Sequence, residues 1–398
     1  MEEKKIRLVS RKEARMLGSS AAAALREYQW RRNFMNARCM LNNDDHGPWG
    51  VQPPIIPYID SRRSVVYYGN IKNGSYNHHS QIAYFKGKYY LSWSNGVINE
   101  EESGQRVLIA SSADGRAWSD AASVREVEKG EQIALNCVAM FAAEDKMYIF
   151  IMTEETIHDT TATGMRRLNN ETSVIDILET EDGLHWKQVF SFGNRIRWIF
   201  EAPRLTRENR LMCVCTSTGR GPAVLLWPGD NVCEEPEFIY VPEPEGASFP
   251  YGEASWYQVD DGRILVFWRD EGGSCKLYVN WSDDGARSFT PPVISDIPDS
   301  MSRVYAGRLE DGRYYLCNNA IGNLLDRGPM MLLTSRDGYV FDQVWMVNDD
   351  PASMRRKGLL KTNGFQYPCC CTVDGKLVIS YDANKEDILC DMIRIEDI

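Results

Sequence analysis

Most of the chain reads as short runs of alternating apolar and polar residues, separated by Gly, Pro, Asn or Asp. Such period-2 runs, rich in Val, Ile, Tyr, Phe and Trp, predict β-strands. The strands fall into six consecutive units of similar size: residues 76–125, 132–190, 195–242, 250–295, 302–347 and 363–398. Residues 11–36 are rich in Ala, Arg and Glu and predict one helix, or two short ones, outside these units.

A short turn motif occurs four times, always after a β-rich run. Each copy has a hydroxyl residue, a spacer, Asp-Gly and then an aromatic residue: 112–118, 180–186, 282–289 and 335–341. Asp-Gly supplies the positive-φ position of a tight hairpin, and the Asp and hydroxyl side chains accept backbone N–H bonds. One copy is an ordinary turn, but four copies indicate a repeated β unit.

The spacing of the motif indicates how many units there are. The copies start 68, 102 and 53 residues apart, and the long gap fits one unit that lacks the motif. We therefore expect an all-β fold, a β-propeller of six blades, with a seventh built from the N-terminal segment as the alternative. The last unit shows three strands, and Ser64–Tyr68 would supply a fourth and close the ring. Residues 1–62 are then an N-terminal extension and residues 63–398 a single propeller domain.

The amino-acid composition limits the kinds of binding partner and the cellular compartment that we expect. The formal net charge of −11 argues against nucleic acid, although a site can be locally basic and take an acidic substrate. The chain begins Met-Glu-Glu-Lys-Lys with no apolar leader, and no run of 18 apolar residues suggests a membrane span. The eleven cysteines are an odd number and lie mostly in apolar strands, and Cys369-Cys370-Cys371 lacks zinc-site spacing. We expect free thiols in a cytoplasmic protein; the oligomeric state is left open.

Candidate chemistry begins with Asn77-His78-His79, where the first unit starts. Histidine is the side chain whose ordinary pKa lies nearest neutrality, so this pair is the first candidate for an acid/base. Neighbouring strand residues face opposite sides, so one ring at most is expected to enter the channel. The alternative is two structural histidines. With no third ligand adjacent in sequence, neither a metal nor a cofactor is expected.

Polar residues at comparable strand ends recur in the later units. Glu253 and Arg269 would meet if their strand pair lines the channel, with a structural ion pair as the alternative. The remaining candidates for substrate binding are Trp198, Glu201, Arg204, Tyr251, Arg303, Asn319, Lys361 and Tyr367. Together with Asn77 and Arg269 they predict a cationic, aromatic-flanked pocket for an acidic sugar.

The turn motif resembles the Asp box of sialidases, and residues 70–398 resemble the sialidase-like propellers of bacteria. The segments that carry the likeness are NHHSQIAYFKGKYYLSWSNG, residues 250–270, IPDSMSRVYAGRLEDGRYYLCNN and the closing GFQYP…DGKLVISYDANKEDI. Within that group these segments are similar to those of the α-L-rhamnosidases and rhamnosyl-glucuronate lyases. Those enzymes are described as seven-bladed, and they use a histidine of the first blade for catalysis. That resemblance implies His78 or His79 as the catalytic group, with His79 favoured, and Glu253 as a further candidate.

Three functions follow as hypotheses. The leading one is a glycoside hydrolase or lyase that uses a histidine acid/base on an acidic oligosaccharide containing uronate or rhamnose. The second is an exo-sialidase, for which the resemblance implies three arginines, a Tyr–Glu pair and an Asp acid. Arg204, Arg269 and Arg303 are its arginine candidates, although Arg204 stands in Glu-Ala-Pro-Arg rather than Arg-Ile-Pro and the Asp has no recognisable match. The third is a propeller that binds a glycan or a protein without catalysis.

Overall fold

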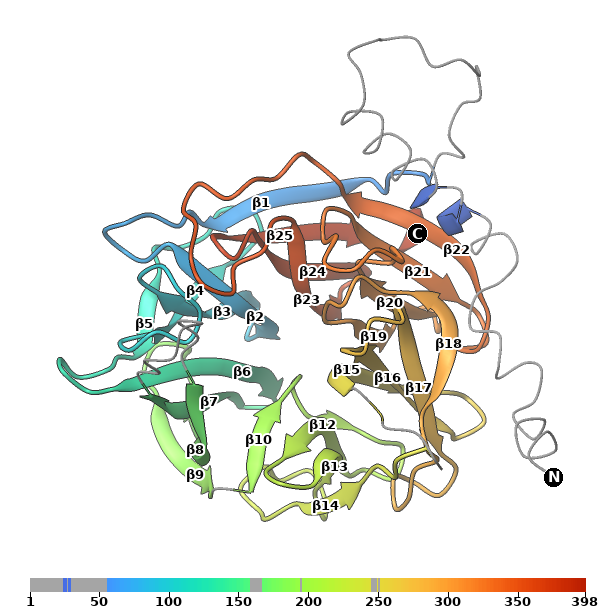
Figure 1. Ribbon diagram of the computed structural model, residues 1–398, viewed down its shortest axis with the longest axis horizontal. Coiled ribbons are helices and arrows are strands. Elements are labelled where there is room, and N and C mark those ends of the chain that lie inside the picture. The colour runs from blue at the N-terminus through green and yellow to red at the C-terminus, as the bar shows by residue number, and fades with distance from the viewer. Residues whose placement is uncertain are drawn as a thin grey trace, which may run out of the picture.

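The computed structural model describes residues 24–26, 28–29, 56–157, 167–193, 195–244, 249 and 251–398, with the side chains of 157, 167–172 and 251 left aside. In these residues six antiparallel sheets stand around a central channel (Figure 1). The chain is therefore a six-bladed β-propeller, as the repeat spacing predicted, and the seven blades implied by the resemblance are not what it forms.

Each blade is built from strands that follow one another in sequence, and the first strand of each blade lines the channel. Blade 1 holds β2 (Tyr76–Phe85), β3 (Lys88–Gly96), β4 (Arg106–Ser112) and β5 (Ala122–Arg125). Blade 2 holds β6 (Ile133–Ala143), β7 (Lys146–Ile157), β8 (Arg167–Thr180) and β9 (Lys187–Phe192). Blade 3 holds β10 (Ile196–Ile199), β11 (Arg204–Leu205), β12 (Leu211–Ser217), β13 (Gly221–Leu226) and β14 (Glu237–Tyr240).

The second half repeats the plan. Blade 4 holds β15 (Tyr251–Gln258), β16 (Ile264–Asp270), β17 (Lys276–Ser282) and β18 (Val293–Pro298). Blade 5 holds β19 (Tyr305–Arg308), β20 (Tyr314–Asn318), β21 (Met330–Ser335) and β22 (Phe341–Asn348). Blade 6 holds β23 (Phe365–Val373), β24 (Lys376–Ala383) and β25 (Asp387–Arg394), and the short 3₁₀ helix Ile395–Asp397 follows it.

The ring closes through a strand from the other end of the chain. β1 (Ser61–Tyr67) pairs antiparallel with β25 and becomes the fourth strand of blade 6. Buried Asp391 of β25 fixes this pairing, because its carboxylate accepts bonds from Ser61 Oγ at 2.6 Å and Arg63 Nε at 3.1 Å. Closure by a strand that precedes blade 1 is confirmed.

The four turn motifs occupy equivalent places, each joining the third and fourth strands of a blade. In the first, Ser112 Oγ accepts the Gly115 N–H at 2.8 Å and Asp114 Oδ1 accepts the Arg116 and Ala117 N–H groups at 2.9 Å. Gly115 has φ +70° and an added Cβ would lie 2.1 Å from Met392 Sδ, so glycine is required there. Blade 3 carries no copy, which accounts for the long gap.

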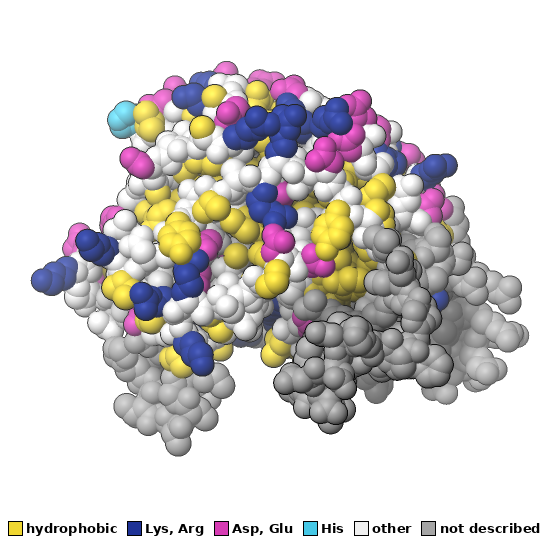
Figure 2. All heavy atoms as spheres, turned by 90° about the horizontal axis from the view of Figure 1, so that it is seen from above, with side chains coloured by type: hydrophobic (Ala, Val, Ile, Leu, Met, Phe, Trp, Pro, Cys, Tyr) yellow, Lys and Arg dark blue, Asp and Glu magenta, His cyan; other side chains and the backbone are white. Residues whose placement is uncertain are grey.

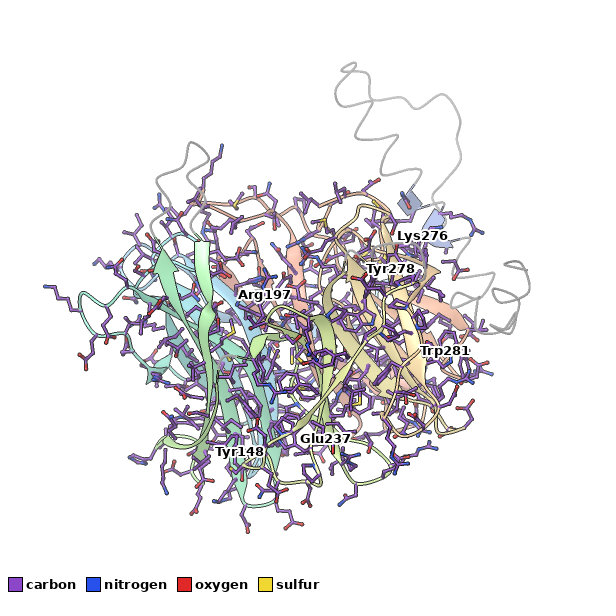
Figure 3. The ribbon with its side chains drawn as sticks, turned by 60° about the horizontal axis from the view of Figure 1, so that its bottom comes forward. Tyr148, Arg197, Glu237, Lys276, Tyr278 and Trp281 are labelled. Carbon is purple, nitrogen blue, oxygen red and sulfur yellow. The ribbon has the colours of Figure 1, made fainter. Side chains whose placement is uncertain are left out.

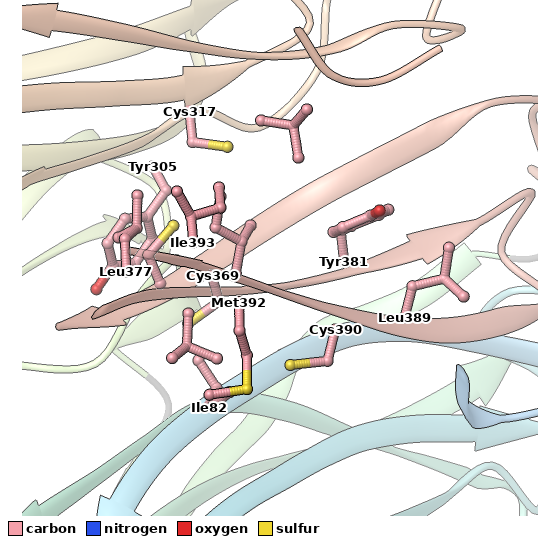
Figure 4. Close-up of a cluster of buried hydrophobic side chains, with 14 of the residues drawn as sticks. Ile82, Tyr305, Cys317, Cys369, Leu377, Tyr381, Leu389, Cys390, Met392 and Ile393 are labelled. Carbon is pink, nitrogen blue, oxygen red and sulfur yellow. The ribbon is translucent and has the colours of Figure 1, made fainter. Parts of the chain in front are cut away.

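The core lies between neighbouring blades. Alternate residues of the blade 6 strands face blades 5 and 1, so Leu377 and Ile393 pack with Cys317 and Tyr305, and Ile82 packs from the other blade (Figure 4). The second strands of blades 3 and 4, β12 and β16, are buried on both faces, which explains their nearly continuous apolar runs.

The N-terminal segment is helical where it is described, at residues 24–26 and 28–29, as expected. Leu25 is buried in the cluster shared by blades 4 and 5. Because this contact ties the segment to the propeller, the division at residue 62 stays a prediction.

Two general expectations bear on the described residues. The ten cysteines described are all free thiols. Among the described helical residues none forms a helix long and apolar enough to cross a membrane. On the face shown in Figure 2, basic and acidic side chains lie interspersed with apolar ones.

Candidate functional site

Irregular backbone distinguishes one end of the channel. The inner strands β2, β6, β15 and β23 each change register near their first residues, between His78 and Gln81 in β2 and between Gln366 and Cys369 in β23. His79 and Tyr367 both have φ +56° inside these bulges. A bulge re-aims side chains at a strand end, and such strained residues gather at functional sites.

The bulge in β2 brings both histidines together. The ring centroids of His78 and His79 lie 4.2 Å apart, and the Tyr367 ring lies 4.1 Å from His78 and 5.7 Å from His79. The expectation that strand alternation separates the two rings is therefore wrong, because the left-handed backbone at His79 breaks the alternation.

His78 is held by a carboxylate. Its Nδ1 lies 2.6 Å from Asp382 Oδ2, while Asp382 Oδ1 accepts the Lys385 backbone N–H at 2.7 Å. Burial, together with the nearby Lys385 ammonium, lowers the pKa of His78 well below its usual range, so the imidazole is neutral. Among the described residues, Nε2 of His78 has no hydrogen-bond partner. Its nearest carboxylate oxygen is Glu100 Oε1, 3.9 Å away.

Tyr367, Glu253 and Arg269 form a second hydrogen-bonded group. The Tyr367 hydroxyl donates to Glu253 Oε1, and Arg269 Nη1 donates to Glu253 Oε2 and, at 2.9 Å, to the Tyr367 oxygen. β15 and β16 are paired, so Glu253 and Arg269 are neighbours across one hairpin. Glu253 and Arg269 therefore meet, as the sequence led us to expect.

The charges of this group are set by its cations. Burial alone would raise the pKa of Glu253, but the Arg269 and Arg303 guanidinium groups outweigh it and hold the pKa far below its usual range. Burial and the Glu253 charge raise the pKa of the Tyr367 hydroxyl. The pair is therefore a protonated phenol that donates to a carboxylate.

Three cations surround the Tyr367 ring. The guanidinium carbons of Arg303 and Arg327 lie 4.7 and 5.7 Å from its centroid, and Lys385 Nζ lies 5.8 Å away. Arg327 is engaged by Gln366 and by the Met301 carbonyl. Arg303 is only 3% exposed, yet within the described part of the chain its Nε and Nη2 lack hydrogen-bond partners. A buried guanidinium with free donors is suited to receive an anion.

Carboxyl groups from different blades stand at the rim. Burial raises the pKa of Glu101 to about 8, and it also raises the pKa of Glu154 and Glu271. Arg197 of β10, labelled in Figure 3, partly opposes all three shifts. The rim therefore gathers three carboxyl groups with raised pKa around one basic side chain.

Three predicted residues have structural partners instead. Asn77 accepts from Trp93 Nε1 at 2.9 Å and donates to the Glu386 carbonyl at 2.6 Å. Lys361 Nζ donates to the Ser75 and Arg356 carbonyls and to Glu386. Asn319 Nδ2 donates to three backbone carbonyls, among them that of Phe365 at 2.8 Å. Their amide and ammonium donors hold loops together.

Glu201 and Arg204 also lie apart from Tyr367. Arg204 donates to Glu201 Oε2 at 2.8 Å, to the Trp256 carbonyl at 2.6 Å and to the Ala306 carbonyl at 2.7 Å, which joins blades 3, 4 and 5. It lines a cavity of about 640 Å³ at the other ends of the inner strands. Trp198 does reach the site, since its ring lies 5.1 Å from His79. The side chain of Tyr251 lies outside the described residues.

Two residues of the site were not among the sequence-based candidates. Asp382 lies near the end of β24 in blade 6, and Glu100 lies in the loop after the second strand of blade 1. A carboxylate at a strand end in blade 6 was a usable signal for Asp382. Nothing in the run Glu100-Glu101-Glu102 indicates which of the three faces His78. His78, His79 and Glu100 reopen the question of a metal site, because these two histidines and one carboxylate offer ligand atoms within 4.8 Å of one another.

The comparisons with known proteins match this fold. The crystal structure of a protein of unknown function from Dyadobacter fermentans aligns with TM-score 0.61 at 14% identity, over 84% of this chain and 99% of that one. The Hadza microbial sialidase Hz136 aligns with TM-score 0.65 at 12% identity, over 84% and 68%. The Trypanosoma rangeli sialidase in complex with sialic acid aligns with TM-score 0.60 at 11% identity, over 86% and 60%. No curated protein sequence matches the chain.

At these identities the structural matches define the fold, that of the sialidase-like propellers. The model of the BNR repeat-like domain matches residues 87–379. The chain therefore belongs to the BNR repeat-like domain family. The finer resemblance to rhamnosidases and rhamnosyl-glucuronate lyases stays a prediction.

Proposed function

We propose that this protein cleaves a glycosidic bond beside a carboxylated sugar, with Tyr367 as the attacking group and Arg303 as the anchor of the sugar carboxylate. The observation that carries this proposal is the buried Tyr367–Glu253–Arg269 group with Arg303 over the same ring. Similar folds include sialidases, whose name denotes action on an acidic sugar.

Arg303 supports the anionic part of the substrate. Its guanidinium is buried, and among the described residues two of its nitrogens lack partners. Leaving a charged donor unsatisfied in a buried place costs about 1–3 kcal/mol, which a bidentate carboxylate would recover. Among the described residues Arg269 and Arg327 already have acceptors and each keeps only its Nε without one, so Arg303, with two such nitrogens, has the most binding capacity left.

Tyr367 and Glu253 support the bond-breaking part. The Tyr367 oxygen bonds to the anomeric carbon while its phenolic proton passes to Glu253, and the leaving oxygen departs with the electrons of the broken bond and takes a proton from solvent water. Arg269 stays bonded to both oxygens and stabilises the charge as it moves between them. Water then bonds to the anomeric carbon and gives its proton to solvent, while the bond to Tyr367 breaks and the Tyr367 oxygen takes its proton back from Glu253.

A second candidate is β-elimination from a uronate, which the His78–Asp382 pair favours. A neutral imidazole whose Nε2 has no hydrogen-bond partner in the described part of the chain is suited to take the proton beside a carboxylate, and Arg303 would neutralise that carboxylate. This route retains the histidine acid/base expected from the sequence, now at His78 rather than His79.

The test is a panel of oligosaccharides that end in a sialic acid, in a uronate or in a neutral sugar. Hydrolysis adds the mass of water and gives no new ultraviolet absorbance, whereas elimination gives an unsaturated uronate that absorbs. A fluorinated glycosyl donor that traps a covalent adduct should label the peptide containing Tyr367. Elimination products without any adduct would replace the first route by the second.

Matched variants locate the chemistry. Tyr367→Phe removes the attacking oxygen and should lower kcat by roughly 10²- to 10⁴-fold with little change in Tm. Tyr148→Phe, near the first residue of β7 in blade 2, should leave kcat unchanged (Figure 3). Binding of an acidic glycan without turnover of any panel member would instead show a glycan-binding propeller.

A further inference from the structure

We propose that His78, His79 and Glu100 form a binding site for one divalent transition metal ion, of which Zn²⁺ is the best fit. This site goes beyond the proposed function and does not depend on it. One ring nitrogen of each histidine and one carboxylate oxygen of Glu100 lie within 4.8 Å of one another. Two imidazoles and a carboxylate are a ligand set that suits zinc.

The backbone of β2 is what makes the site. Adjacent strand residues cannot normally share a ligand, because their side chains face opposite sides. The bulge after His78 and the positive φ of His79 bring the two rings to 4.2 Å between centroids. The third ligand, Glu100, comes from the loop after β3. It is not adjacent to the histidines in sequence, so only the folded chain shows that it lies beside them.

The orientation of His78 is that of a metal ligand. Its Nδ1 lies 2.6 Å from Asp382, and a carboxylate on one imidazole nitrogen commonly orients the other nitrogen towards a metal. His78 is fully buried, and Nε2 has no hydrogen-bond partner among the described residues. Metal binding would select the tautomer with the proton on Nδ1.

Small movements complete the geometry. Ligand atoms of a tetrahedral zinc ion lie about 3.4 Å apart, given bonds of about 2.0–2.1 Å. His78 Nε2 and Glu100 Oε1 are now 3.9 Å apart, and no two of the three ligand atoms are more than 4.8 Å apart, so side-chain shifts of up to about 1.4 Å bring all three to this spacing. The Glu100 side chain is 10% exposed, which gives the ion a route from solvent. With three protein ligands, one coordination position stays open to water or substrate.

Lys385 competes with the ion for Glu100. Its Nζ lies 2.5 Å from Glu100 Oε2, so the ammonium already supplies the positive charge beside this carboxylate. Arg303 is a further cation near His78, and its positive charge weakens the binding of a metal ion there. The site therefore exchanges an internal cation for an external one, and removal of Lys385 should strengthen metal binding.

The experiment measures metal binding directly. Full-length protein with its accessible thiols alkylated is titrated with Zn²⁺ by calorimetry, and with Co²⁺ by visible absorption of a four- or five-coordinate N/O site. We expect one equivalent to bind. His78→Ala and Glu100→Gln should each weaken binding at least 10-fold, while Lys385→Gln should tighten it.

His185→Ala is the matched control, because His185 is exposed and lies beside Asp182 on a turn motif. Its binding should equal that of the wild type. The proposal is overturned if the wild type binds no metal at millimolar concentration, or if Glu100→Gln binds like the wild type. It is also overturned if Lys385→Gln leaves affinity unchanged while remaining folded. Glu100 is a loop residue, so its variant keeps the test decisive even if His78→Ala does not fold.

Discussion

At the scale of single residues, the polar side chains near the site are of two kinds: some meet around Tyr367, and others hold the backbone by hydrogen bonds. Arg303, His78 and Tyr367 meet at one end of the channel, while Asn77, Asn319 and Lys361 spend their donors on backbone carbonyls. Both sets look alike in sequence, because both are polar residues near strand ends. The difference lies in the acceptors that the folded chain places around each donor.

Arg303→Ala tests charge recognition. It removes the cation with free donors, so KM for a carboxylated substrate should rise roughly 10- to 100-fold, as expected for loss of a charged hydrogen bond. KM for a neutral analogue should change little. Steady-state kinetics on both substrates measures the ratio, and equal effects on the two would assign Arg303 to the scaffold.

Asp299→Asn tests a buried carboxyl behind the site. Burial raises the pKa of Asp299 to about 7, while the neighbouring Arg269 and Arg327 lower it only in part. Because the folded pKa exceeds the unfolded one, Asp299 destabilises the fold progressively as pH rises from about 4 to 7. Asn, already neutral, should therefore raise the unfolding free energy at pH 8 by roughly 2 to 4 kcal/mol and change it little at pH 4.

Melting curves at the two pH values give the comparison, with the exposed Asp230→Asn as the control expected to follow the wild type at both. A stabilisation of Asp299→Asn that is equal at pH 4 and pH 8 would contradict the assignment.

At the scale of elements, the turn motif places each outer hairpin against the preceding blade of the ring. Gly338 shows this, since it has φ +75° and an added Cβ would lie 2.3 Å from Val259 Cγ1 of blade 4. The Tyr257 hydroxyl donates to the Gly338 carbonyl at 2.6 Å. The motif is therefore both a turn and a contact between blades, and it lies away from the site residues.

Gly338→Ala should accordingly lower stability more than Gly375→Ala. Both positions have positive φ, which costs an alanine about 1–2 kcal/mol. An alanine at Gly375 would meet no atom within 4 Å, whereas at Gly338 it would overlap Val259 and add about 1–3 kcal/mol. Denaturant unfolding of the two variants measures the difference, and equal losses would show that the contact between blades is easily displaced.

At the scale of the whole molecule, the propeller is held by closure of blade 6. Residues 61–67 and 387–394 come from opposite ends of the propeller sequence and share one sheet (Figure 1). Arg63 connects this sheet to blade 5, since it donates to the Val347 carbonyl at 2.8 Å and bonds to Asp350 and buried Asp391. Without β1, the edge of β25 would be exposed to pairing with other chains.

Arg63→Ala should lower the unfolding free energy by about 1–3 kcal/mol, because it leaves the buried Asp391 carboxylate without its cation. Arg62→Ala, on the exposed side of the same strand, should change it by less than about 0.5 kcal/mol. Denaturant unfolding measures both, and a similar loss for the two would mean that Asp391 is adequately held by Ser61 and Tyr381.

The sequence by itself determined the architecture. Alternating polarity gives strands, the spacing of the turn motif gives blades, and a unit one strand short requires a partner from the other end; each of these signals is local or periodic. It also singled out His78, His79, Glu253, Arg269, Arg303 and Tyr367, which the structure brings together; that they form the functional site stays a prediction. Only the tertiary structure decided how these residues meet. Bulges at His79 and Tyr367 overturn strand alternation, and Asp382 and Glu100 reach His78 from segments far away in the chain or in a loop. Such contacts depend on backbone angles and on the packing between blades, and neither leaves a periodic trace in the sequence.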